Sequence, residues 1–150
     1  MASDFRERTD CPLGLRNNNP GFLVTNSEAL RFPGYRDGNH GFCIFEDVSW
    51  GICAFLWYYY RHVQRNPGAT IGSYLKMYTA DTRKYIATVV ASSGLSADDL
   101  LPIDPDTIIK VMRGQFEAEL GGKEYADLIS DADILDGFAL LLLLPEDVVS

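Results

Sequence analysis

The spacing of apolar residues separates an irregular N-terminal third of the chain from a series of helices. Between Val48 and Val63, apolar residues recur every three or four positions, and Asp47 precedes them as an N-cap residue. The same spacing, with its own capping and stop residues, predicts four more helices: from Thr70 to Tyr78, Asp81 to Gly94, Asp104 to Gly121, and Ser130 to Leu142. Short helices with short connections indicate a compact, mainly α fold.

The first 45 residues carry scattered Gly, Pro and Asn, which interrupt regular structure. Two short apolar runs, at residues 22–24 and 42–45, are bounded by turn residues and are the candidate strands of this region. A chain of 150 residues is the size of one domain. We therefore expect a single α-rich domain at residues 14–144, with an N-terminal arm at 1–13 and a C-terminal tail at 145–150.

Four consecutive aromatic residues, from Trp57 to Tyr60, lie within the first long helix. The expected inward stripe of that helix comprises Phe55, Leu56, Tyr59 and Val63. Four neighbours on a helix cannot all face one core, so one or two of the aromatic rings must contact something else. The sequence leaves three interpretations open, which are a carbohydrate groove, packing on several sides and contact with another chain.

Residues 14–21, Gly-Leu-Arg-Asn-Asn-Asn-Pro-Gly, form the most constrained segment of the chain. Asn favours turns and tolerates the left-handed region, Pro fixes φ and lacks an N–H, and Gly supplies positive φ. Such a segment is neither ordinary helix nor central strand. We expect a loop of defined shape in which Asn17, Asn18 or Asn19 makes side-chain hydrogen bonds to the body of the domain.

This segment resembles the Arg-Asn-Asn-Asn-Pro-Gly-Asn signature of small bacteriophage and prophage proteins, which are described as virion structural proteins or lysozyme-like lytic proteins. Further segments resemble the family in the same order, so that the likeness spans roughly residues 14–140: residues 41–54, 70–78, 85–89 and 130–138. The chain differs from the family at three places. Phe22 replaces the Asn after Pro-Gly, residues 78–82 lack a Pro-rich insertion, and residues 118–121 keep a Glu but lack a His and an Asn.

The resemblance implies a lysozyme-like helical domain in a phage virion protein that is synthesised in the host cytoplasm. It implies other virion proteins as partners, through the Trp57–Tyr60 surface or the C-terminal helix, and peptidoglycan as a further partner. Two interpretations of its activity stay open. The chain is either a structural protein whose catalysis has degenerated or an active muramidase or lytic transglycosylase used in entry or release.

A lysozyme-like reaction needs a carboxylic acid whose pKa is raised by apolar surroundings. Glu119 lies at the end of an apolar-faced helix and corresponds to the Glu of the family, so it is the first candidate for the catalytic acid. Glu117 and Glu46 are the alternatives. Glu119 is also consistent with a solvated surface acid, and Glu46 with an acid in the first turn of a helix, which the helix dipole favours. The expected sugar-binding residues are Arg16, Asn17, Asn18, Asn19 and Tyr58.

The charge and composition exclude several other classes of protein. A formal net charge of −8 argues against nucleic acid, because phosphate binding needs clustered Lys and Arg. The longest apolar run, residues 138–144, is far shorter than a membrane span, which needs about 20 residues. Cys11, Cys43 and Cys53 have no metal-type spacing, and Cys43 and Cys53 lie in apolar surroundings that favour small buried residues over a Cys11–Cys43 bridge. We therefore expect no metal, no cofactor and no membrane span.

Overall fold

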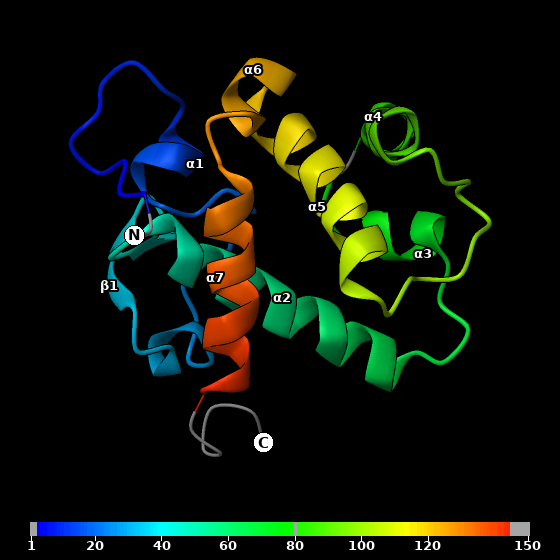
Figure 1. Ribbon diagram of the computed structural model, residues 1–150, viewed down its shortest axis with the longest axis horizontal. Helices are drawn as coiled ribbons and strands as arrows, with labels where there is room; N and C mark the ends of the chain where they lie inside the picture. The colour runs from blue at the N-terminus through cyan, green and yellow to red at the C-terminus, as the bar shows by residue number, and fades with distance from the viewer. Residues whose placement is uncertain (1–2, 80, 145–150) are drawn as a thin grey trace.

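The computed structural model describes residues 3–79 and 81–144 of the chain, and this part is mainly helical with a small two-stranded antiparallel sheet near the N-terminus (Figure 1). The expected fold class is thereby confirmed. The elements are α1 (Leu13–Arg16), a 3-10 turn η1 (Ala29–Arg31), β1 (Tyr35–Asn39), β2 (Phe42–Phe45), α2 (Val48–Arg65), α3 (Ile71–Leu75), α4 (Thr82–Ser93), α5 (Pro105–Leu120), α6 (Lys123–Ala126) and α7 (Asp131–Leu142).

Helix α2 forms the centre of the molecule, and α7 lies across it (Figure 1). The two helices approach closely at Gly137, where an added Cβ would lie 2.5 Å from Cγ2 of Ile52. Within α2, Phe55, Leu56 and Tyr59 are fully buried, which confirms the phase expected for this helix. The helix is therefore enclosed on several sides, which is what its apolar surface requires.

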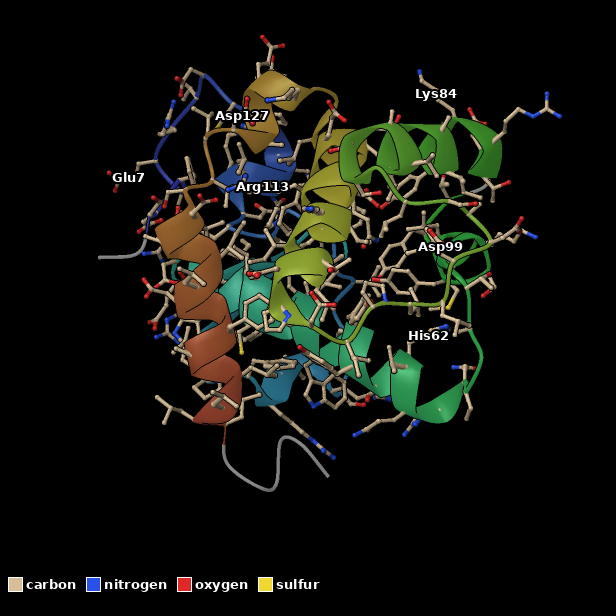
Figure 2. All side chains as sticks on the ribbon, turned by 45° about the vertical axis from the view of Figure 1, so that its right-hand side comes forward. Glu7, His62, Lys84, Asp99, Arg113 and Asp127 are labelled. Carbon is tan, nitrogen blue, oxygen red and sulfur yellow. The ribbon has the colours of Figure 1, made fainter. Side chains whose placement is uncertain are left out.

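The second half of the fold is built on α5, which packs against α4 on one side and continues into α6 (Figure 1). Phe116 and Met112 of α5 are buried in the same core as Phe55 of α2. Charged side chains such as Glu7 and Lys84 extend from the outside of this body (Figure 2). The main core thus joins the long helices, and a smaller cluster around Phe45 and Trp57 lies beneath the sheet.

The helix starts follow the capping residues of the sequence. The side chains of Asp47, Thr70, Asp104 and Ser130 each accept a hydrogen bond from a backbone N–H in the first turn of their helix. Such bonds satisfy N–H groups that have no partner inside the helix. The helix after Thr70 is shorter than expected, because it ends at Leu75 and not near residue 78.

One of the two expected strands forms, and the other strand of the sheet lies elsewhere in the chain. Strand β2 at residues 42–45 is present, but its partner is Tyr35–Asn39, and residues 22–24 contribute a single bridge from Val24 to Phe42. The reason is the turn between β1 and β2. His40 and Gly41 both have positive φ, at 53° and 84°, which is the geometry of a tight two-residue hairpin turn.

The asparagine segment, residues 14–21, is bound to the rest of the domain by close packing and side-chain hydrogen bonds. Asn18 adopts the left-handed conformation with a φ of 54°, and its carbonyl lies against Gly51 of α2, where a Cβ would come within 1.9 Å of that oxygen. The Asn18 side chain donates to the Phe45 carbonyl at 2.9 Å and accepts from the Phe5 N–H at 2.8 Å. Asn19 accepts from the Leu23 N–H at 2.9 Å. The expected side-chain hydrogen bonds to the body of the domain are confirmed.

The boundary expected after residue 13 does not mark a separate arm. Phe5 and Cys11 belong to the main core, and the Ser3 N–H donates to Oδ1 of Asp133 in α7 at 2.8 Å. Residues 3–13 are therefore integrated into the domain, while the expected tail at 145–150 lies outside the described residues. Cys43 and Cys53 are buried free thiols, as the sequence indicated, and Cys11 is a third one.

Candidate functional site

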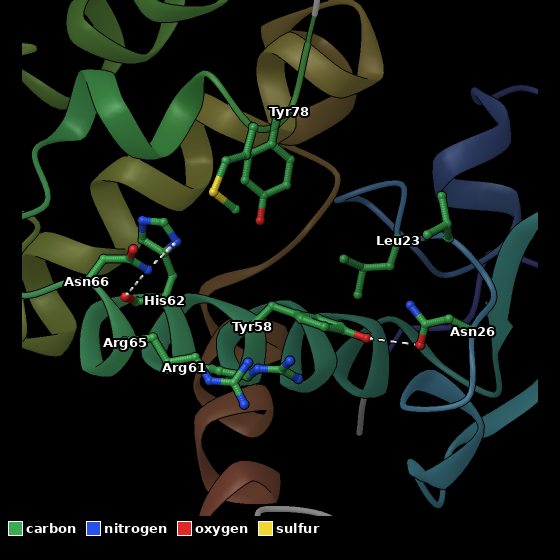
Figure 3. Close-up of a pocket in the computed structure, with 10 residues that line it drawn as sticks. Leu23, Asn26, Tyr58, Arg61, His62, Arg65, Asn66 and Tyr78 are labelled. Carbon is green, nitrogen blue, oxygen red and sulfur yellow. Dashed lines mark hydrogen bonds between the residues drawn. The ribbon is translucent and has the colours of Figure 1, made fainter.

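A cleft lies between the N-terminal segment around Leu23 and the segment that follows α3, and Figure 3 shows the part of it that has α2 at its base. It consists of two hollows that share Leu23, Val24, Met77 and Tyr78. One hollow, of about 480 Å³, also contains Gly21, Phe22, Phe42 and Glu119, and we call it the acid end. The other, of about 380 Å³, also contains Asn26, Tyr58, Arg61, His62, Arg65 and Asn66, and we call it the basic end.

Glu119 provides the titratable group of the acid end. It lies in the last turn of α5, and burial raises the pKa of its carboxyl from 4.5 to about 7, because a charged group loses hydration there. The hydroxyl of Tyr85 donates a hydrogen bond to Oε1 of Glu119 at 3.0 Å and partly offsets that rise. The carboxyl is therefore available in its protonated form near neutral pH.

A chain of buried polar groups holds Tyr85 and Glu119 in place. Gln115 is fully buried on α5, and its Nε2 donates to the Tyr85 hydroxyl at 3.5 Å. Tyr74 donates from its hydroxyl to Oε1 of Gln115 at 3.2 Å and shares a hydrogen bond of 3.2 Å with the Tyr78 hydroxyl. The Tyr78 and Tyr85 rings are stacked, with their centroids 6.3 Å apart. This network connects the acid to the cleft wall at Tyr78.

Aromatic side chains form much of the wall beside Glu119. Phe22 and Phe42 meet edge to face, with their ring centroids 5.4 Å apart. Phe22 has a φ of 50°, a left-handed backbone conformation that a bulky residue rarely adopts. The chain therefore accepts backbone strain here and places an aromatic ring in the cleft.

The two alternative acids lie elsewhere. Glu117 is on a different hollow of the surface, beside Lys84 and Thr88. Glu46 forms an ion pair with Arg36. Neither of them lines the cleft, so Glu119 is the candidate acid that the fold brings to it.

The expected sugar-binding residues are separated by the fold. Asn17, Asn18 and Asn19 are buried, so their amides face the interior of the domain and are not available to a sugar in the cleft. Arg16 is exposed but does not line the cleft. Tyr58 does line the basic end, where its hydroxyl donates to Oδ1 of Asn26 at 3.3 Å. The amides of Asn18 and Asn19 satisfy buried backbone groups, and the Asn17 side-chain oxygen accepts a hydrogen bond from Asn39.

Several residues of the site were not identified from the sequence. Nothing in the neighbourhood of Tyr85 along the chain pointed to a contact with Glu119, which is 34 residues away. Gln115 could have been suspected, because it is a polar residue between the apolar positions Met112 and Phe116 of one helix. The cations of the basic end follow the aromatic run and appear in the sequence as an ordinary basic helix end.

Comparison with known protein families found no family model that matches the chain, and comparison with curated proteins found no match. Within the described residues, no group of three or more His, Cys, Asp and Glu side chains is arranged to hold a metal ion. In the same part of the chain, every helix is too short or too polar to cross a membrane.

Proposed function

We propose that this chain is a phage virion protein with a lysozyme-like domain, and that its cleft cleaves peptidoglycan glycan strands with Glu119 as the general acid. The observation that carries the catalytic part is the position of Glu119. A carboxyl whose pKa is raised to about 7 lines an aromatic-walled cleft, and a tyrosine donates to it. The virion part is supported by the resemblance of residues 16–21 and of the ordered segments that follow them.

The protonated carboxyl of Glu119 is suited to give its proton to the oxygen of a glycosidic bond. As the bond between this oxygen and the anomeric carbon breaks, its electron pair stays on the oxygen and the leaving sugar departs as an alcohol. The 6-hydroxyl of the remaining sugar then attacks the anomeric carbon and returns its proton to the Glu119 carboxylate. The product is a 1,6-anhydro sugar, and the acid is regenerated.

The lytic transglycosylase reaction is favoured over hydrolysis by the residues that line the cleft. Hydrolytic glycosidases use two carboxyl groups, about 5–5.5 Å apart for retention and about 6.5–9.5 Å apart for inversion. In the described part of the chain, Glu119 is the single carboxylic acid among the residues lining the cleft. An internal hydroxyl nucleophile removes the need for a second one. Tyr78, Phe22 and Phe42 offer ring faces and edges on which sugar rings pack.

A second candidate function is a purely structural role in the particle. It is favoured by the end of α7, where Leu142 and Leu143 are 87% and 78% exposed. Large apolar side chains at the surface commonly mark contacts with other proteins. This role is compatible with catalysis and replaces it if the cleft proves inactive.

A zymogram on purified peptidoglycan tests the catalytic part. The wild-type protein and Glu117→Gln should clear the substrate, because Glu117 lies outside the cleft. Glu119→Gln should not clear it, and circular dichroism should show that this variant is folded. Absence of clearing by the wild type leaves the structural role as the proposed function, whereas clearing by Glu119→Gln assigns the acid to another residue.

A further inference from the structure

The basic end of the cleft collects positive charge in a protein that is acidic overall. Arg61, His62 and Arg65 lie on the last two turns of α2 and line one hollow, although the formal net charge of the chain is −8 (Figure 3). Figure 3 places Tyr78 and Leu23 on opposite sides of this hollow, with α2 beneath them. Because Tyr78 and Leu23 also line the acid end, a ligand that reaches the cations lies in the same groove as Glu119.

The two arginines have different roles in this hollow. Arg61 forms an ion pair with Glu28, and its guanidinium lies 4.9 Å from the centroid of the Trp57 ring. Arg65 has no carboxylate within ion-pair distance among the described residues. Burial lowers the pKa of Arg61, and the charge of Arg65 lowers it further, which indicates that the two guanidinium groups are close. Two neighbouring cations with one carboxylate between them leave an unbalanced positive charge.

His62 adds a polar group without adding charge. Burial lowers the pKa of its imidazole, so the ring is neutral near pH 7. The amide of Asn66 lies 3.3 Å from Nδ1 of His62 and lines the same hollow. An anion in this hollow would contact the guanidinium of Arg65 and the neutral polar groups of His62 and Asn66. Such a set of donors suits a carboxylate.

We propose that the basic end binds a carboxylate carried by the glycan strand, with Arg65 as its main charge contact. This inference rests on the proposed function, since it names the substrate group that lies beside the bond cleaved at Glu119. The substrate class is therefore an acidic glycan, and a neutral glycan of the same length binds less tightly. The carboxylate belongs either to the lactyl group of muramic acid or to an attached peptide, and both present the same chemistry to Arg65.

Calorimetric titration of Glu119→Gln, which binds without turnover, tests the inference with three tetrasaccharides. The first is chitotetraose, which is neutral. The second alternates N-acetylglucosamine with N-acetylmuramic acid and has free lactyl carboxylates, and the third carries peptides on those lactyl groups. At low salt we expect one or both acidic ligands to bind about tenfold more tightly than chitotetraose, as one charge-assisted contact allows. A preference for the second or the third ligand identifies the source of the carboxylate.

Two further substitutions separate the charge contact from general electrostatics. Adding Arg65→Gln should abolish the preference for the acidic ligands and leave chitotetraose binding unchanged. Adding Arg83→Gln, an exposed arginine on α4 outside the cleft, should preserve the preference. Equal binding of all three ligands, unaffected by Arg65→Gln, overturns this inference and leaves the proposed function standing. Binding of none of them contradicts the proposed function as well.

Discussion

Among the single residues, Glu119 combines two opposing influences. Burial raises the pKa of its carboxyl, and the hydrogen bond from Tyr85 lowers it, with a net result of about 7. A group with that pKa keeps its proton at neutral pH and can still lose it during a reaction, which is what a general acid requires. The position near the C-terminal end of α5 adds to the effect, because the helix dipole disfavours negative charge there.

The raised pKa of Glu119 predicts how stability depends on pH. The native state binds this proton more tightly than the unfolded chain, so the stabilisation is complete below about pH 4.5 and is lost as the pH rises through about 7. Relative to Glu119→Gln, the wild type should lose about 2–3 kcal/mol of unfolding free energy between pH 4.5 and pH 8. Guanidinium denaturation at both pH values measures this difference. A difference that does not change with pH contradicts the raised pKa.

Tyr85 predicts a shift in the pH profile. Because its hydrogen bond lowers the pKa of Glu119, Tyr85→Phe should raise that pKa further. The alkaline limb of peptidoglycan cleavage, which follows deprotonation of the acid, should then move to higher pH. Carboxyl chemical shifts of Glu119, followed by NMR titration of both proteins, give the same readout without turnover. If the alkaline limb of the activity profile and the NMR pKa of Glu119 are the same in Tyr85→Phe as in the wild type, Tyr85 does not lower the pKa of the acid.

The helices were largely predictable because their signals are local. Capping side chains at Asp47, Thr70, Asp104 and Ser130 act within one turn, so the sequence alone locates them. The pairing of the hairpin was not predictable in this way. Residues 35–39 lack an apolar alternation, and their strand exists because the His40–Gly41 turn folds them onto residues 42–45.

The site was predictable in part for the same reason. Glu119 was identified from its apolar helix and from the resemblance to the phage family. Its partner Tyr85, which accepts a hydrogen bond from Gln115, reaches it through the packing of α4 against α5, which no local pattern encodes. The asparagine segment was recognised as constrained, but its burial depends on α2 and β2, so its role in sugar binding was wrongly expected.

The packing of α2 predicts that shortening one of its buried side chains strongly lowers the free energy of unfolding. Leu56 is fully buried between the two halves of the fold, so Leu56→Ala should lower the free energy of unfolding by about 2–5 kcal/mol. Leu135→Ala on α7 is the matched control. Its side chain is 57% exposed, and it should cost less than about 1 kcal/mol. Similar losses in the two variants, measured by chemical denaturation, would contradict the central position of α2.

At the scale of the whole molecule, the two most exposed large apolar side chains among the described residues, Leu142 and Leu143, lie together at the end of α7. Trp57 and Tyr59 of the aromatic run are buried, and Tyr58 and Tyr60 are half-buried, so none of the four rings is as exposed as the leucines at the end of α7. Leu142 and Leu143 are exposed. We therefore expect the C-terminal helix, of the two surfaces considered from the sequence, to contact another virion protein.

If the end of α7 makes this contact, substitutions there should impair assembly into the particle without affecting catalysis. Replacing both Leu142 and Leu143 with Glu should reduce incorporation of the protein into phage particles, because charge is unfavourable in an apolar interface. Clearing of peptidoglycan by the purified variant should equal that of the wild type. Quantitative mass spectrometry of purified particles measures incorporation. Normal incorporation of the double variant would show that this surface is not the contact.

The most direct measurement is the analysis of soluble products from purified peptidoglycan by liquid chromatography and mass spectrometry. The wild type and Glu117→Gln should release fragments with 1,6-anhydro ends. Glu119→Gln should release at least about 100-fold less, the loss expected on removing a general acid. Fragments with hydrolysed ends would show that the enzyme is a hydrolase and not a transglycosylase. No release by the wild type, or undiminished release by Glu119→Gln, would contradict the assignment of Glu119 as the acid that cleaves glycan in this cleft.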